Sequence, residues 1–145
     1  MAQKRQLASC FVDDRLFGID VATVQEVMSG VDLTPVPLAP PIIGGLLNLR
    51  GQIVTAIDLR RCLQLPDRAA DQPTVNLILR TDEGCTGVLV DAVGDVLEVD
   101  EDDFERPPET LRGRSRELIP GAYKLAGRLL LVLDTDEMLR GIGGV

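Results

Sequence analysis

The side chains left to perform catalysis in this sequence are carboxylates, lysines and three cysteines, because the chain contains no histidine. The commonest general base and the commonest metal ligand among side chains are therefore missing. Cys10, Cys62 and Cys85 form no CxxC pair, and no candidate base lies beside any of them in the sequence. We expect reduced core thiols, and neither a secreted disulfide framework nor a nucleophile.

Two aspartates, Asp58 and Asp134, occupy matching positions and could be imagined as an acid–base pair. Each follows an apolar run and precedes a short segment of helical composition. An aspartate in that position commonly accepts a hydrogen bond from a free N–H of the first helical turn. We therefore expect both to be N-caps, and we keep a carboxylate-dependent hydrolase only as the alternative to a protein without enzymatic activity.

A run of four acidic residues, Asp100-Glu101-Asp102-Asp103, could in principle form a calcium-binding site. The central glycine and distal glutamate of an EF-hand are absent, so we expect a solvated turn in which Asp100 caps a short helix. No P-loop occurs, and the GxG of residues 141–143 lies in a glycine-rich tail. The sequence thus predicts no metal, nucleotide or other cofactor.

Arg50 is a charged residue for which a role in the fold gives no explanation. It precedes Gly51 at the tip of a predicted hairpin whose neighbouring segments are strongly apolar. Arg50 could simply be a solvent-exposed turn residue. Alternatively, it pairs with Glu26, which is flanked by apolar residues, and forms a charged spot on the rim of an apolar groove. Such a rim is typical of protein-recognition sites.

The elements that must position these residues occur twice in the chain. Residues 45–63 read as a strand, a turn, a second strand and a short helix, and residues 121–139 repeat their glycines, leucines and aspartate at a constant offset of 76. Residues 18–21 recur at residues 87–90 with an offset of 69. Aligned blocks in one order indicate a tandem duplication of one small β unit.

The remaining segments of the first unit are assigned from their patterns. Residues 7–12 and 16–20 predict a hairpin, and residues 21–28 have the spacing of a helix of about two turns. Residues 91–97 resemble that helix-like segment in the second unit. The proline-rich residues 34–41 predict an extended edge segment or connection, because proline cannot donate to a sheet ladder.

These assignments predict an all-β protein with two small β-barrel subdomains and short helices. We expect residues 1–66 to form the first subdomain, residues 67–74 a linker, and residues 75–145 the second subdomain with a short C-terminal helix. Aromatic residues make up only 3% of the chain, so the cores must be aliphatic. Two barrels in 145 residues would each be marginal alone, so they should pack along an apolar seam.

The charge balance excludes some classes of partner. A net charge of −8 argues against nucleic acid and against direct contact with anionic membranes, since both require a basic face. No signal-peptide core and no apolar run of membrane-spanning length is present. These observations favour a cytoplasmic protein whose partners are other proteins.

The motif GLLNLRGQIVTAIDLRRCL at residues 45–63 closely resembles the signature of the CheW family, as do residues 17–27 and residues 87–93. The resemblance implies two SH3-like five-stranded barrels related by the duplication. It also implies a cytoplasmic adaptor that couples chemoreceptors, the methyl-accepting chemotaxis proteins, to the histidine kinase CheA in bacterial chemosensory signalling, recruited to membrane-associated receptor arrays. The alternative within the family is a regulatory module of a kinase or of a multidomain adaptor.

In this family the tip of the receptor's helical hairpin docks between the barrels, and the kinase contacts barrel ends. The matching receptor-binding positions here are Glu26, Val27, Gly45, Asn48, Arg50, Gly51, Val88 and Val90. The matching kinase-binding positions are Gln52 and Ile53 on the first unit, and Glu105, Thr110 and Leu111 on the second.

Overall fold

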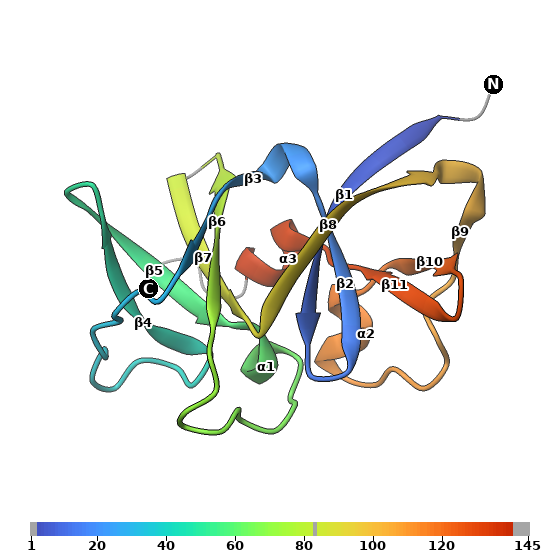
Figure 1. The fold of residues 1–145 in the computed structure, drawn as a ribbon. Coiled ribbons are helices and arrows are strands. Elements are labelled where there is room, and N and C mark those ends of the chain that lie inside the picture. Colours follow the sequence, from blue (N-terminus) through green and yellow to red (C-terminus); the bar gives the residue numbers. More distant parts are fainter. Residues whose placement is uncertain (1–2, 83, 141–145) are drawn as a thin grey trace.

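Short antiparallel strands make up most of the computed structural model, which describes residues 3–82 and 84–140 (Figure 1). The strands are β1 (Lys4–Val12), β2 (Arg15–Asp20), β3 (Val24–Ser29), β4 (Ile43–Leu49), β5 (Gln52–Asp58), β6 (Val75–Thr81), β7 (Gly84–Val90), β8 (Ala92–Asp100), β9 (Phe104–Glu105), β10 (Gly121–Leu125) and β11 (Arg128–Val132). The helices are α1 (Leu59–Cys62), α2 (Arg114–Leu118) and α3 (Thr135–Arg140), with the 3₁₀ helices η1 (Val21–Thr23) and η2 (Glu101–Asp103). The described residues leave out residues 1–2, 83 and 141–145. The start of the first predicted subdomain, the end of the second and the GxG of residues 141–143 therefore lie outside them.

The strands form two sheets, and the two halves of the chain exchange their first hairpins between them. The six-stranded sheet has the order β8-β1-β2-β11-β10-β9, and the five-stranded sheet has the order β3-β6-β7-β5-β4. The hairpin β1–β2 from the first half thus joins strands of the second half, and β6–β7 joins strands of the first. The all-β class with short helices is confirmed. The boundaries 1–66 and 75–145, however, do not separate the two sheets, because grouping strands by their place in the sequence ignores this exchange.

The exchange follows the internal duplication residue by residue. Each sheet contains one parallel strand pair, β2 with β11 and β5 with β7, formed between the two halves. Gly18 pairs with Val132 in the first case, and Gly87 pairs with Ala56 in the second. These positions are equivalent under the offsets of 69 and 76. The duplicated sequence therefore uses the same register twice, and neither sheet is complete without the other half of the chain.

Three clusters of mostly aliphatic side chains fill the molecule. One lies within the six-stranded sheet around Leu7 and Leu130, and one within the five-stranded sheet around Leu47 and Ile78. The largest contains buried residues from both sheets and from all three helices. This shared cluster packs the two sheets together through apolar side chains.

Two segments with helical spacing are strands in the structure. Residues 21–28 form the short turn η1 and then β3, which pairs with β6, and residues 92–97 belong to β8, which pairs with β1. The predictions of a helix in residues 21–28 and of a like segment in residues 91–97 are therefore wrong. Apolar spacing over so few residues fits a strand as well as a helix. Burial along β3 alternates residue by residue, as in a strand at a sheet edge.

The other local predictions are confirmed. Residues 7–12 and 16–20 lie in the hairpin β1–β2. The proline-rich segment is an extended connection whose backbone forms an isolated bridge between Thr34 and Leu46, with both N–O distances at 2.8 Å. Asp58, Asp100 and Asp134 each accept a hydrogen bond of 3.0 Å from a backbone N–H two or three residues further on, as N-caps do.

Candidate functional site

The turn between β4 and β5 places Arg50 on the surface in a conformation that points its side chain toward β3. Arg50 has φ +50° and Gly51 has φ +89°, so both residues of the turn are left-handed, as a two-residue hairpin turn requires. The side chain of Asn48 closes the turn by accepting a 2.8 Å hydrogen bond from the N–H of Gly51. Asn48 therefore shapes the loop that carries Arg50.

Arg50 forms a two-pronged ion pair with Glu26. Its Nη2 lies 2.6 Å from Oε1 and its Nη1 lies 3.1 Å from Oε2 of the same carboxylate. The side chain of Arg50 is 67% exposed and that of Glu26 is 29% exposed. This geometry supports the second of the two interpretations of Arg50, a charged pair on the surface, over an isolated turn arginine.

The pair connects the two strands at opposite ends of the five-stranded sheet. Glu26 lies on β3, Arg50 follows β4, and β3 and β4 are first and last in the strand order. The bridge between Thr34 and Leu46 ties the connection after β3 to β4 through the backbone. The ion pair thus links the edge strand β3 to the turn that follows the opposite edge strand.

The electrostatics of the pair keep both groups charged at neutral pH. The hydrogen bond from Arg50, together with its positive charge, holds the pKa of Glu26 below its ordinary value despite some desolvation. The same hydrogen bond and the carboxylate charge raise the pKa of the Arg50 guanidinium. A partner protein that contacts this pair therefore contacts a positive guanidinium and a negative carboxylate held side by side.

Apolar side chains are exposed on the strands that adjoin this pair. Val27, next to Glu26 on β3, is 48% exposed, and Ile53 on β5 is 66% exposed. The sequence analysis missed two more exposed valines, Val93 and Val96 on β8, which is an edge strand of the other sheet. Their exposure was missed because their segment was assigned as helix-like. Apolar residues on an edge strand need not be core residues.

Three of the receptor-binding positions implied by the resemblance lie in the interior. Val88 and Val90 are 0% exposed and belong to the shared core cluster, because β7 is a central strand of its sheet. Gly45 is buried as well, and a Cβ there would lie 2.9 Å from both the Leu33 Cβ and the Thr34 carbonyl oxygen. These three residues support the fold and offer no contact surface, whereas Glu26 and Val27 on β3 and Asn48, Arg50 and Gly51 at the β4–β5 turn lie where the Arg50–Glu26 ion pair joins these two segments. We call these five residues the tip patch.

The implied kinase-binding positions fall on different sheets. Gln52 and Ile53 are exposed on β5, next to the tip patch. Glu105 is exposed on β9 at the edge of the six-stranded sheet, with its Oε1 3.5 Å from the Nζ of Lys124. Thr110 is exposed, but Leu111 is only 8% exposed and is part of the shared core. Leu111 therefore anchors its loop in the core and offers little surface for contact with a kinase.

Comparison with known proteins decides which family has this architecture. The profile of the CheW-like domain matches residues 6–142. The chain belongs to the CheW-like domain family. The resemblance of the motif at residues 45–63 is thereby confirmed over nearly the whole length of the chain.

Named relatives and a solved structure agree with the CheW assignment. The chain is 32% identical over 123 residues to the Chemotaxis protein CheW of Klebsiella aerogenes, covering 85% of this chain and 74% of that protein. It is 31% identical over 128 residues to the Chemotaxis protein CheW of Bacillus subtilis, covering 88% and 82%. The crystal structure of the scaffolding protein TtCheW from Thermoanaerobacter tengcongensis superposes with a TM-score of 0.81 at 26% identity, covering 91% of this chain and 90% of that one.

Two further properties of this CheW-like domain concern chemistry and membranes. Among residues 3–82 and 84–140, no group of three or more histidine, cysteine, aspartate or glutamate side chains is placed to hold a metal ion. No helix in the same part of the chain is long and apolar enough to cross a membrane.

Proposed function

We propose that this protein is a non-catalytic adaptor that couples chemoreceptors to the histidine kinase CheA in chemosensory signalling. Membership of the CheW-like domain family and similarity to proteins named for chemotaxis and for scaffolding support this role. The observation that carries it is the tip patch, an exposed ion pair with exposed apolar side chains beside it. Such a surface recognises another protein and has no group that attacks a substrate.

The receptor docks its helical hairpin tip against the tip patch in this proposal. Val27 offers apolar contact area, while Glu26 and Arg50 offer hydrogen bonds of both polarities at a fixed separation. A helix laid against apolar side chains with charged groups at the margin is a common recognition mode. Asn48 and Gly51 contribute by holding the turn, so their effect on binding passes through Arg50.

The kinase uses other parts of the surface in this proposal. Gln52 and Ile53 on β5, Glu105 on β9 and Thr110 in the loop after β9 are exposed. Leu111 supports the second of these regions from below. Signal transfer then consists of a shift in the relative positions of receptor and kinase, which requires differential contacts and no chemical step. The adaptor works in the cytoplasm, where receptor tips and kinase are both accessible.

Charge reversal of Arg50 tests the receptor surface. Arg50→Glu places two carboxylates side by side at the tip patch, so receptor binding should weaken at least about tenfold, while the amide spectrum of the core stays unchanged. The measurement is a titration of the labelled protein with a receptor hairpin fragment, followed by NMR. Arg116→Glu is the matched control, because Arg116 is an exposed arginine on α2, away from the tip patch. An identical titration for wild type and Arg50→Glu would refute the proposed surface.

Complex formation tests the coupling role itself. The protein is mixed with the kinase CheA and the receptor fragment, and the mixture is separated by gel filtration. A peak that contains all three proteins is expected, and Arg50→Glu should remove the receptor from that peak while leaving the kinase. Absence of any ternary peak with wild-type protein at concentrations above the pairwise dissociation constants would contradict the adaptor role and reopen the hydrolase alternative.

A further inference from the structure

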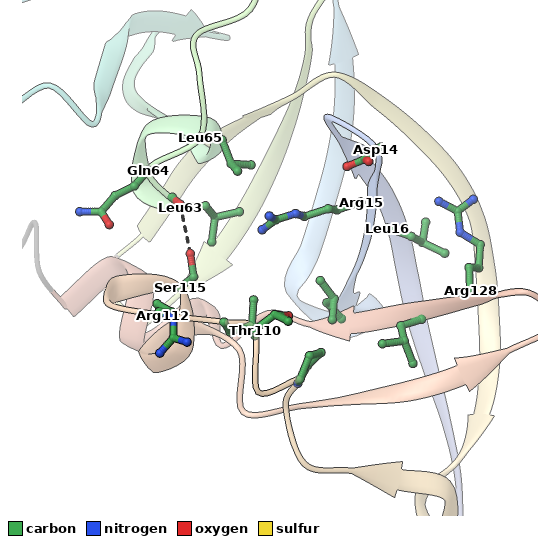
Figure 2. A pocket seen from close by; sticks show the side chains of 14 residues that line it. Asp14, Arg15, Leu16, Leu63, Gln64, Leu65, Thr110, Arg112, Ser115 and Arg128 are labelled. Carbon is green, nitrogen blue, oxygen red and sulfur yellow. Dashed lines mark hydrogen bonds between the residues drawn. The ribbon is translucent and has the colours of Figure 1, made fainter.

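A cleft of about 550 Å³ is lined by residues that do not include any of the tip patch, and Figure 2 shows its lining side chains. Its walls come from four segments that are distant in the sequence: the turn between β1 and β2 with the start of β2, the chain after α1, residues 108–115 from the loop into α2, and β11. The strand residues among them belong to the six-stranded sheet, and the chain after α1 closes the other side. A volume of this size accommodates several side chains of a partner.

The floor of the cleft is apolar and rigid. Leu16, Leu63, Leu111 and Leu131 line it, and each is less than 9% exposed. Ser115 ties two of the walls together, because its Oγ donates a 3.1 Å hydrogen bond to the carbonyl oxygen of Leu63. The base of the cleft is thus part of the core and is not free to collapse.

The rim carries three arginines that lack a carboxylate partner. Arg15, Arg112 and Arg128 line the cleft, and none of them makes an ion pair within residues 3–82 and 84–140. The Arg128 guanidinium lies 5.3 Å from the centroid of the Phe11 ring. Asp14 is the one carboxylate among the lining residues. Three uncompensated arginines at one place are unexpected by composition in a chain of net charge −8.

We propose that this cleft is a docking site for an acidic segment of a partner protein, with one or two aliphatic side chains that reach the leucine floor. The charge complementarity selects the acidic partner, and the leucines select the aliphatic anchor. A small free anion fits less well. Arg112 and Arg128 are exposed and stand around the rim, so they do not converge on one point from within the cleft.

The docking site is independent of the proposed coupling role. The cleft shares Thr110 and the buried Leu111 with the proposed kinase surface, but its three arginines and its other leucines lie outside that surface and outside the tip patch. The test uses the protein and a peptide alone, without receptor or kinase. Failure of the cleft proposal therefore leaves the adaptor proposal standing, and the reverse also holds.

The probe is a fluorescein-labelled synthetic peptide, acetyl-ELEELLEELE-amide, titrated with the full chain at low ionic strength. Saturable binding is expected, with amide shifts in NMR at Leu63 and Ser115, and affinity should fall as salt is added. The same peptide with every glutamate replaced by lysine should not bind. No saturation up to millimolar protein would overturn the proposal, as would shifts that map away from the cleft.

Variants separate the cleft from general electrostatic attraction. Arg15→Glu and Arg128→Glu should each weaken binding of the glutamate peptide about tenfold. Arg112→Glu, at an exposed loop position, provides a third variant should Arg15→Glu disturb the hairpin turn. Arg80→Glu changes the net charge equally on β6, outside the cleft, and should leave the affinity within twofold. Equal weakening by Arg80→Glu, or complete displacement of the peptide by inorganic phosphate at matched ionic strength, would overturn the peptide-docking proposal.

Discussion

Arg60 and Asp91 form a buried ion pair between α1 and the corner that joins β7 to β8. Two hydrogen bonds connect them, from Nε to Oδ1 at 3.1 Å and from Nη2 to Oδ2 at 2.6 Å. The side chains are only 8% and 11% exposed. The N–H of Asp13 also donates to Asp91, at 2.7 Å, so the carboxylate links the β1–β2 turn of one sheet to the helix that follows the other.

Arg68 extends this pair into a network. Its Nε lies 3.2 Å from Oδ1 of Asp91, and its Nη1 lies 3.0 Å from Oδ2 of Asp58, the N-cap of α1. The segment that was predicted as a linker therefore packs an arginine into the junction between the two sheets. Because the sheets have exchanged hairpins, this junction holds both halves of the chain in register.

Removal of Arg60 should destabilise the protein strongly. Arg60→Ala leaves Asp91 buried with only part of its compensation, and breaking a buried pair in this way costs about 3 kcal/mol. Arg68 remains as a second partner, which keeps the loss near the lower end of the usual range. The free energy of unfolding from urea denaturation gives the measurement. Arg140→Ala, which removes an exposed ion pair with Glu137, is the control and should change stability by less than about 1 kcal/mol.

Asp91 should also make stability depend on pH in the acid range. Burial by itself raises the pKa of Asp91, but hydrogen bonds from Arg60, from the Asp13 N–H and from Arg68 outweigh it, so the pKa lies below its ordinary value of 3.8. A carboxyl group with a lower pKa in the folded state contributes its full stabilisation above the unfolded-state pKa. That contribution is lost as the pH falls through the folded-state pKa.

The comparison of wild type with Asp91→Asn isolates this contribution from those of other carboxylates. Urea denaturation at pH 7, 5, 4 and 3 should show the largest difference in unfolding free energy at pH 7 and 5. The difference should shrink below about pH 4, where the unfolded wild-type chain takes up the proton. A difference that is the same at pH 7 and pH 3 would show that the Asp91 charge does not matter.

The sequence was informative wherever structure is determined locally. Asp58 and Asp134 cap their helices as predicted, because caps depend on neighbours within a few positions. The hairpin that ends at Asp58 is also found, although Gln52, predicted in its turn, is the first residue of β5. The pairing of Arg50 with Glu26 was open in the sequence and is decided by the structure. It could be suspected because the second unit has Ala126 at the position that matches Arg50 under the offset of 76, so the arginine is not needed by the repeated fold.

The sequence was misleading wherever the outcome depends on distant parts of the chain. β3 and β8 are strands because β6 and β1 offer them hydrogen-bonding partners, and no pattern within six to nine residues reveals that. The exchange of hairpins cannot be read from the sequence either. A hairpin that paired with its own half of the chain would bury the same apolar faces as one that pairs with the other half. Arg60 and Asp91 are 31 residues apart and look like ordinary surface residues in the sequence.

Gly45 should be needed for folding and not for contact with a receptor. It has φ +150°, and the Thr34 backbone lies close against it. Gly45→Ala adds both strain and a clash, so the expected loss is about 2 to 4 kcal/mol. Gly30→Ala is the matched control, because Gly30 has φ +64° but nothing within 4 Å of an added Cβ. It should cost only about 1 kcal/mol of conformational strain.

These two variants also distinguish folding from recognition. Urea denaturation measures the stability of each, and the receptor titration described above measures binding of the fraction that remains folded. Intact receptor affinity in folded Gly45→Ala protein is expected, since the residue is buried. A loss of affinity without a loss of stability would instead return Gly45 to the contact surface.

The three cysteines should react in two classes. Cys85 is half-buried and its Sγ lies 3.4 Å from the Gln25 amide oxygen, at a position that solvent reaches. Burial, aided by the charge of Asp91, raises the pKa of Cys10 to about 12, and burial, aided by Asp58, raises that of Cys62 to about 12. A thiol with so high a pKa has almost no thiolate at neutral pH, so only Cys85 should react readily with DTNB.

The rates then report on opening of the shared core. At pH 8 the native protein should release one equivalent of thionitrobenzoate quickly and two slowly. In 6 M guanidinium all three equivalents should be released quickly. Cys85→Ser should lose the fast phase and keep the slow one. Because Cys10 and Cys62 belong to the cluster that joins the two sheets, Arg60→Ala should speed the slow phase by loosening that junction. Two fast equivalents in the native wild type would contradict the buried placement of these thiols.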